Sequence, residues 1–468
     1  MAPVPKNVLF CYSRLPSFTN AVRDYVQSFG SYSLHRIHYY DMDSGPLDFD
    51  LEPFDCIIFN YCYWARCLFV SPDLRERVAS FSGLKIAILQ DEYEYFLWHE
   101  KTLIALGINT IVTCVPERHW CDVFHDDAFK NVTFINALTG YVPDSLLNSS
   151  NYTKPLVERD WVLGYRGRPV PFTYGRLTQE KLLIGQRMKQ ICTERAIPAN
   201  IEVTEESRLY GAAWPEFVGN CRAVLGTESG SNVFDFDGSI KPAIEAFLKE
   251  YPDADFESVH ERFLQGRDDT IHMNQISPRI FEAIALRTGL VLFEGNYSGV
   301  VRPWQHFIPL KKDFSNVDEV FSALADFPSL EAMIQRAYDD VIASGRYHFR
   351  NFIGMLDVHI ENASLPGKGY ELYYGLIAWR SSADAELKVI SGQCMQTPTS
   401  HPWRHLDQIP APIVTVRINW GALHRMVMRW YEAILYSPLG HKCRAYLQGN
   451  AFIYGVAQKC VRLLTGRW

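Results

Sequence analysis

The stretch His272–Ser298, HMNQISPRIFEAIALRTGLVLFEGNYS, contains the pattern that decides the fold. Ser277-Pro278 is a helix-start signal, because a hydroxyl residue suits the N-cap and proline suits the first helical position. Apolar side chains then recur at helical spacing, at Ile280, Phe281, Ile284 and Ala285. Thr288-Gly289 is expected to end the helix, since glycine tolerates the left-handed conformation. The run Leu290–Phe293 predicts a buried strand of a parallel sheet.

A helix that begins at the carboxyl edge of a parallel sheet is suited to bind an anion. Its unpaired backbone N–H groups and its dipole favour negative charge, such as that of a diphosphate. Arg279 lies in the first turn and adds a guanidinium group, and Glu282 follows on the same helix, able to bind ribose hydroxyls. Ser277, Arg279 and Glu282 are therefore candidate nucleotide-binding residues. The alternative is an ordinary helix–strand unit with incidental polar residues.

The segment PRIFEAIALRTGLVLFEG resembles the donor-nucleotide segment of GT-B glycosyltransferases of the group-1, family-4-like type. In that family R-x-F-E-A-x-A-x-G precedes a strand, and the glutamate that matches Glu282 binds the ribose of the sugar nucleotide. The resemblance covers roughly residues 1–362. It implies an α/β GT-B fold, in which two Rossmann-like, doubly wound domains face a cleft. Asn274 stands where the family's E-x7-E pattern has its first glutamate.

Short apolar runs alternate with helical patterns in residues 1–150, which predicts a Rossmann-like domain that the resemblance makes the acceptor domain. The expected strands are Asn7–Tyr12, His35–Tyr40, Asp55–Tyr61, Lys85–Gln90, Thr110–Val115 and Val132–Ile135. A second alternating series predicts a Rossmann-like nucleotide-sugar domain with a crossover helix in residues 151–362. Residues 363–412 contain prolines and no clear periodicity, so we expect a linker there.

The acidic and aromatic loop Asp91–Tyr95, DEYEY, is the best candidate for the acceptor site. Ligands of doubly wound sheets lie beyond the carboxyl ends of the strands, and this loop follows an expected strand. Asp91 is a candidate catalytic residue, because its carboxylate can accept a proton from an attacking hydroxyl, and the tyrosines can stack on a sugar ring. The alternative is a solvated acidic loop.

Two loops of the second domain are candidates for binding the donor. Arg166-Gly167-Arg168 follows the strand Trp161–Tyr165, and a glycine between two guanidinium groups allows close, bidentate contact with phosphate. The small polar loop Thr227–Asn232 follows the strand Arg222–Gly226, so Ser229 is a further candidate. For Lys181, on the helical pattern that follows Arg168, we expect a solvated helix face.

Glu228 is the second candidate catalytic residue. It lies in the donor loop, where it is expected to bind sugar hydroxyls in place of the glutamate that Asn274 replaces. Asp235 and Asp237 form a D-x-D pair, which is typical of metal-dependent transferases of another fold. GT-B enzymes usually stabilise the leaving diphosphate with a helix dipole and basic residues, so we interpret residues 235–270 as a loop insertion and expect no metal site.

Composition limits the class of protein. A chain of 468 residues fits two domains, and 47% hydrophobic with 21% charged residues is typical of a globular protein. The net charge of −7 argues against a nucleic-acid partner. The sequence contains no run of 18 apolar residues and no signal-peptide pattern at the N-terminus. Eleven cysteines without paired spacing favour reduced thiols, so we expect a cytoplasmic protein.

Residues 413–468 differ from the rest of the chain. They contain eight Lys or Arg residues and one acidic residue, Glu432, so they carry +7 although the whole chain carries −7. Apolar residues recur at helical spacing, including Trp420, Leu423, Val427 and Trp430. A basic amphipathic helical tail of this kind suits the anionic surface of a membrane, to which the protein would bind peripherally. The alternative is a tail that packs on the acidic body or on a second subunit.

The sequence thus predicts a hexosyltransferase-like enzyme that moves a sugar from a nucleotide-diphosphate sugar to a hydroxyl group of a glycan, lipid or small molecule. We expect it to use no metal and no other cofactor. The resemblance implies retention at the anomeric carbon, while Asn274 leaves inversion open, with Asp91 as base. The other hypothesis is a catalytically inactive GT-B protein that acts as a scaffold or membrane-associated partner.

Overall fold

The computed structural model describes residues 4–13, 20–42, 49–64, 72–147 and 149–363. The linker expected from residue 363 and the basic tail expected at 413–468 lie outside these residues, except for Ala363, and stay predictions. Apart from Asp41 and Met42, all described residues belong to one compact unit, which contains two parallel sheets. The α/β class with two doubly wound, Rossmann-like sheets, as the GT-B resemblance implies, is confirmed.

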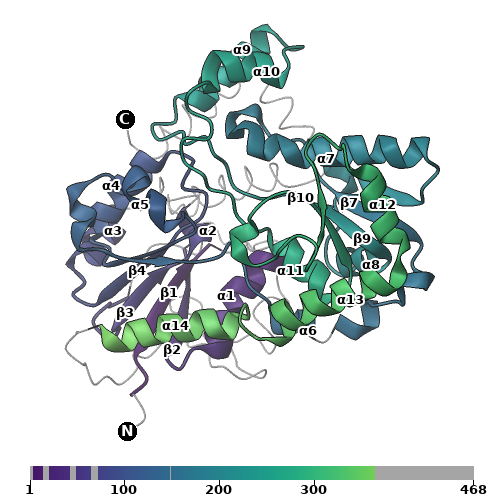
Figure 1. Ribbon diagram of the computed structural model, residues 1–468. Helices are drawn as coiled ribbons and strands as arrows, with labels where there is room; N and C mark the ends of the chain where they lie inside the picture. Colours follow the sequence, from purple (N-terminus) through teal and green to yellow (C-terminus); the bar gives the residue numbers. More distant parts are fainter. Residues whose placement is uncertain (1–3, 14–19, 43–48, 65–71, 148, 364–468) are drawn as a thin grey trace, which may run out of the picture. The chain divides into compact units, whose positions relative to one another are not determined.

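The first sheet has six strands in the order β2-β1-β3-β4-β5-β6 (Figure 1). They are β1 (Asn7–Tyr12), β2 (Arg36–Asp41), β3 (Cys56–Phe59), β4 (Leu84–Ile88), β5 (Thr110–Thr113) and β6 (Thr133–Asn136). Neighbours from β1 to β6 along this order are parallel. β1, β3, β4 and β5 are buried along their whole length, as a sheet covered on both faces requires. All six lie where the apolar runs predict strands.

The second sheet has five strands in the order β11-β10-β9-β7-β8. They are β7 (Trp161–Arg166), β8 (Ala199–Glu202), β9 (Cys221–Gly226), β10 (Gly289–Phe293) and β11 (Ile308–Leu310). All four pairings are parallel. The chain winds to one side of β7 through β8 and to the other through β9, which creates a switch point between β7 and β9.

Helices cover both sheets. In the first half they are α1 (Asn20–Tyr32), α2 (Tyr61–Trp64), α3 (Pro72–Ser80), α4 (Phe96–Leu106), α5 (Trp120–Val123) and α6 (Asp144–Leu147). In the second half they are α7 (Gly175–Glu194), α8 (Ala213–Gly219), α9 (Ile240–Glu250), α10 (Phe256–Val259), α11 (Pro278–Ala285), α12 (Val317–Ala325), α13 (Phe327–Ala337) and α14 (Phe349–Asn362). None of these described helices has the length and apolar character needed to cross a membrane.

The last described helix, α14, returns to the first half, as expected of a crossover helix. In Figure 1 it lies along α1 and the strands of the first sheet, although it follows the second sheet in sequence. Phe352 packs edge-on against Phe29 of α1, with ring centroids 6.4 Å apart. Asp357 accepts hydrogen bonds from the Ser33 hydroxyl and the Leu34 amide, both at 2.7 Å. These contacts join the end of the second half to the first sheet.

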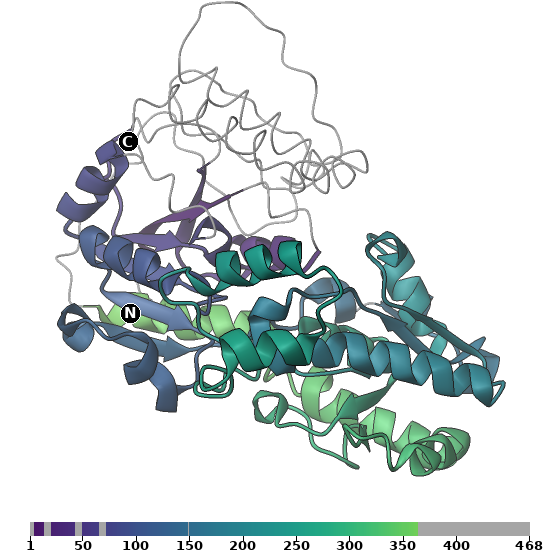
Figure 2. The same cartoon turned by 90° about the horizontal axis from the view of Figure 1, so that it is seen from above.

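One detail of the expected fold is wrong, and the expected insertion is more regular than a loop. The left-handed residue after α11 is Arg287, with φ of 53°, and Gly289 is the first residue of β10. A Cβ at Gly289 would lie 3.0 Å from the Arg222 carbonyl oxygen, so glycine serves close strand packing there. Residues 235–270 are not only a loop, because they contain α9, α10 and a π-helical turn at His260–Leu264. Figure 1 shows α9 and α10 standing out from the sheets, and in Figure 2, which is seen from above, they face the viewer.

Candidate active site

A cavity of about 440 Å3, called the basic cavity below, lies at the carboxyl edge of the second sheet. Gly167 and Arg168, which follow β7, and Thr227, which follows β9, line it. These are the two strands on either side of the switch point, where doubly wound α/β proteins bind ligands. Asp91 and Tyr93, which follow β4 of the first sheet, also line the cavity. Loops from both halves therefore form its wall.

Several cationic side chains converge on the basic cavity: Arg166, Arg168, Lys181, Arg208 and Arg279. Arg208 is paired with Glu205 at 2.7 Å. Arg279 donates a hydrogen bond to the Arg166 carbonyl at 2.5 Å and lies over the Trp214 ring, 5.1 Å from its centroid. Neither Arg168 nor the Lys181 amine makes a hydrogen bond to any residue that the structure describes. The cavity therefore presents two cationic side chains, Arg168 and Lys181, that no described residue hydrogen-bonds.

The placement of Lys181 overturns the expectation of a solvated helix face. The pKa of Lys181 is lowered to about 8, mainly by burial and to a smaller extent by the nearby Arg279, while Asp91 opposes the shift. The signal for its inward position is present in the sequence. Lys181 lies on the same stripe of α7 as buried Leu177, Thr178 and Ile184, at spacings of three and four residues.

Arg166 lines the cavity, but its guanidinium group already has protein partners. It donates to the Tyr165 and Asn200 carbonyl oxygens at 2.8 and 3.0 Å and to the Asn200 side-chain oxygen at 2.8 Å. It also stacks on Phe217, with its carbon 4.1 Å from the ring centroid. Arg168 is more exposed than Arg166 and makes no hydrogen bond to the described residues. Of the two predicted arginines, Arg168 is therefore the better placed to contact a ligand.

The first half contributes an acidic edge to the cavity. The protein around Asp91 desolvates the carboxylate and raises its pKa, while a hydrogen bond from the Tyr93 hydroxyl, at 2.5 Å, lowers it. Tyr93 packs edge-on against Tyr174, with centroids 5.7 Å apart. The Tyr174 hydroxyl donates a hydrogen bond to Glu94. The predicted acceptor loop thus lies against residues of the second half, and the role of Asp91 stays a prediction.

The start of α11 lies on the cavity wall through Ser277 and Arg279, as the sequence predicts for a helix that meets a ligand. Ser277 occupies the N-cap with Pro278 after it, and its side chain makes no capping hydrogen bond. Glu282, one turn further on, does not line the cavity. Its carboxylate accepts a 2.7 Å hydrogen bond from Trp214 Nε1, and burial raises its pKa. Trp214, which sequence reasoning missed, is the side chain that lines the cavity there.

Glu228 lines a second cavity, of about 360 Å3, which we call the amide cavity. Its carboxylate accepts hydrogen bonds from the Asn296 and Tyr297 amides at 3.0 and 2.8 Å and from Asn274 at 2.7 Å. Other residues that line the amide cavity include Asn136, Gln275 and Ser298. The structure therefore does not bring the two predicted catalytic carboxylates, Asp91 and Glu228, into one cavity.

Ser229 separates the two cavities. Its backbone pairs with that of Gln275 through hydrogen bonds of 2.7 and 2.8 Å, and Ser229 lines the basic cavity while Gln275 lines the amide cavity. Gly230 follows with φ of 101°, and a Cβ there would lie 2.1 Å from the Met273 carbonyl oxygen. Only glycine fits this position. Gly230 therefore allows the backbone of the loop to lie close to the backbone at Met273.

No family model and no curated protein matches the chain. Several solved structures resemble it at low identity. TarM is 10% identical with a TM-score of 0.35, over 66% of this chain and 55% of TarM, so the chain spans about half the length of that protein. A glycosyltransferase from Rickettsia africae ESF-5 is 11% identical with a TM-score of 0.41, over 77% and 100% of the two chains.

A third solved structure is an alpha-glucosyltransferase in complex with UDP and a 13-mer DNA containing a HMU base. It is 10% identical with a TM-score of 0.44, over 76% of this chain and 99% of that one. The solved structures that this chain resembles thus include glycosyltransferases. At TM-scores below 0.5, these likenesses do not decide what the chain binds.

Proposed function

We propose that the protein is a glycosyltransferase that moves a sugar from a nucleotide-diphosphate sugar to an acceptor hydroxyl. The observation that carries the proposal is the convergence of Arg168, Lys181 and Arg279 beside the start of α11, at the switch point of the second sheet. Two of these cations have no hydrogen-bond partner among the described side chains, and a helix N-terminus adds positive potential. A diphosphate would satisfy all of them.

The same cavity offers a surface for the base of the nucleotide. Trp214, Phe217 and Val224 line it with aromatic and apolar groups, which suit the face of a flat ring. Glu282 lies behind Trp214, so we propose that it acts on the ribose together with the indole or by holding the indole in place. The amide cavity, with Asn136, Gln275 and Ser298, is rich in groups that exchange hydrogen bonds with sugar hydroxyls.

In the proposed reaction the bond between the sugar and the diphosphate breaks, and the electron pair leaves with the diphosphate. The cations of the basic cavity stabilise the charge that develops on the leaving group. The acceptor oxygen forms the new bond and loses a proton. Asp91 is the proposed proton acceptor for an inverting reaction. For a retaining reaction, which the sequence resemblance implies, the proton goes to an oxygen of the leaving diphosphate, and we assign the sugar contacts to Glu228.

A panel of nucleotide sugars tests the proposal. At about 100 times its Kd, a ligand that binds only the folded protein adds roughly 2.7 kcal/mol to the free energy of unfolding, which a thermal-shift assay detects. We expect at least one nucleoside diphosphate and its sugar to raise Tm, and the corresponding sugar to be released or transferred on incubation. Binding without turnover would favour the inactive scaffold. A panel in which no nucleotide raises Tm would refute a donor site in the basic cavity.

We propose further that transfer needs no divalent metal, because the cations and the helix start supply the charge that a metal would otherwise supply. The carboxylates of the D-x-D pair have other partners: Asp235 accepts from the Ile240 and Lys241 amides at 3.1 and 3.0 Å, and Asp237 from the Ser239 amide at 3.0 Å. Activity should therefore survive EDTA. A complete loss that manganese or magnesium restores would show the expectation to be wrong.

A further inference from the structure

Residues 233–270 leave the second sheet after β9 and contact the first half before they return to α11. The contact is made by Val233–Gly238, which we call the strap. Its Asp235 amide donates to the Tyr93 carbonyl at 2.8 Å, and its Asp235 and Phe236 carbonyls accept from the Tyr95 and Leu97 amides at 2.9 and 3.0 Å. Glu94 and Asp235 thereby form a parallel β-bridge. The strap extends along the segment that carries Asp91.

The strap is fixed on its own side by Asp235. This residue is 4% exposed, and its two carboxylate oxygens accept from the first amides of α9, as described above. Gly238 allows the strap to approach the first half, because its φ is 77° and a Cβ there would lie 2.2 Å from the Tyr95 ring. The Phe236 ring adds an edge-on contact with His125, at 5.1 Å between centroids.

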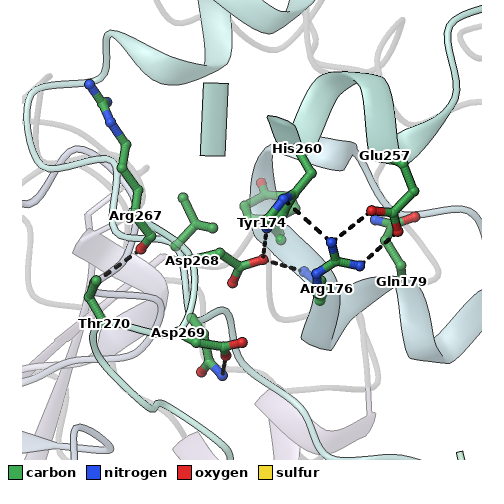
Figure 3. Close-up of polar contacts among 12 residues, drawn as sticks. Tyr174, Arg176, Gln179, Glu257, His260, Arg267, Asp268, Asp269 and Thr270 are labelled. Atoms are coloured by element: carbon green, nitrogen blue, oxygen red, sulfur yellow. Dashed lines mark hydrogen bonds and ion pairs between the residues drawn. The ribbon is translucent and has the colours of Figure 1, made fainter. Parts of the chain in front are cut away.

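The far end of the insertion is anchored to α7 by a polar cluster (Figure 3). The Arg176 guanidinium makes two 2.7 Å hydrogen bonds to Glu257, and its backbone amide donates to Asp268 at 2.8 Å. His260 lies 3.3 Å from the same Asp268 oxygen. α7 is also the helix that directs Lys181 into the basic cavity. The insertion therefore links a helix of the donor side to the loop of the opposite wall.

The segment that the strap holds has an unusual backbone. Asp91 and Tyr95 have φ of 62° and 52°, in the left-handed region that residues other than glycine rarely adopt. Such conformations persist only where the surrounding structure enforces them, and they concentrate at functional sites. The strap makes hydrogen bonds to Tyr93, Tyr95 and Leu97. Tyr95 is therefore held directly, and Asp91 lies two residues before the first of these bonds.

We propose that the strap holds the segment Asp91–Tyr95 in this conformation, so that Asp91 faces the basic cavity, and that Asp235 is the positioning residue. The inference rests on the proposed function for its catalytic consequence but not for its structural part. Asp235 acts through the backbone, because its carboxylate fixes the start of α9 and so fixes the peptide that pairs with Tyr93 and Tyr95. The first aspartate of the D-x-D pair, Asp235, then has a structural role at the start of α9.

Hydrogen exchange and kinetics on the full chain test this. In Asp235→Ala, the Tyr95 and Leu97 amides should exchange about tenfold faster, because their acceptors are no longer held. The kcat for the best donor of the panel should fall by about tenfold while its KM stays within twofold, because positioning of the opposite wall is lost and not the donor site. Asp235→Asn keeps one capping oxygen and should lie between wild type and alanine.

The matched control is Asp237→Ala, which removes an exposed aspartate two residues away and should change neither exchange nor kcat. Unchanged exchange in a folded Asp235→Ala or Asp235→Asn would overturn the strap. Faster exchange with unchanged kcat would overturn the positioning role. If wild type turns over no nucleotide sugar, the proposed function fails, and the exchange of Tyr95 and Leu97 alone then decides whether the strap holds the segment.

Discussion

Lys181→Met should weaken the binding of the preferred nucleoside diphosphate by roughly 30-fold, since a hydrogen bond to a charged group contributes about 2 kcal/mol. The Lys181 amine lines the basic cavity without a hydrogen-bond partner in the described part of the chain. Methionine keeps the length of the side chain and removes the charge. Calorimetry measures the change. Lys189→Met is the matched control, because Lys189 is on the same helix but pairs at the surface with Glu202, at 2.8 Å.

The pH dependence of binding identifies Lys181 more sharply. Its pKa in the free protein is lowered to about 8, so it is a cation below that pH and loses its proton above it. A bound diphosphate favours the charged form and raises the pKa, so binding above pH 8 requires proton uptake. Affinity should be constant from pH 7 to 8 and then fall by up to about tenfold per pH unit. Lys181→Met should abolish this fall. A wild type with constant affinity up to pH 9.5 would exclude Lys181 from the diphosphate site.

The position of Lys181 was predicted wrongly from the sequence, because this residue lines the basic cavity. Lysines on amphipathic helices are usually solvated, which is why a solvated position was expected. The apolar stripe of Leu177, Thr178 and Ile184, on which Lys181 lies, indicates the inward position instead. The sheets, in contrast, were predictable, because buried parallel strands require continuous apolar runs such as Cys56–Phe59. The order of the strands fixes the switch point, and the position of the basic cavity follows from it.

The separation of the predicted catalytic pair has a local cause. Thr227 and Ser229 line the basic cavity, and Glu228 between them lines the amide cavity. In extended chain, successive side chains point to opposite sides. The side chains of Thr227, Glu228 and Ser229 alternate in the same way, so the sequence alone could have predicted that Glu228 points away from its two neighbours. What the sequence does not contain is the set of donors that hold Glu228, because Asn274 and Tyr297 come from distant segments.

The insertion was the part least accessible to sequence reasoning. Its aspartates and glycines are typical of a loop, although the segment contains α9, of 11 residues, and α10, of four. Its structure depends on contacts with residues far away in the chain, including Tyr93 and Arg176. The insertion has a small apolar core of its own, formed by Val233, Ile240, Ile244, Val259 and Leu264. Hydrophobic periodicity reports such burial within an element, but it does not report the hydrogen bonds that join the insertion to the first half and to α7. Such partners are fixed only by the fold.

Glu92→Gln should raise the free energy of unfolding at pH 8 by about 3 kcal/mol, the equivalent of a pKa shift of roughly 2.5. Glu92 is 3% exposed, and one of its carboxylate oxygens is buried without a hydrogen-bond partner among the residues that the structure describes. The other oxygen accepts from the Thr113 hydroxyl. Burial raises the pKa of Glu92 from 4.5 to about 7, so the folded protein favours the neutral carboxyl group. Glutamine has nearly the same shape and stays neutral at every pH.

The sign of the effect fixes the pH window. Below pH 4.5 the carboxyl group is protonated in both the folded and the unfolded chain, and it has no effect on stability. Between pH 4.5 and about 7 only the folded chain keeps the proton, so wild type loses stability as the pH rises. The advantage of Glu92→Gln should therefore be small at pH 5, grow towards pH 7 and stay constant above it. Urea denaturation at pH 5, 6, 7 and 8 measures it, with the exposed Glu117→Gln as the control that should change nothing. If Glu92→Gln changed the free energy of unfolding equally at pH 5 and pH 8, burial would not be what keeps the carboxyl group of Glu92 neutral.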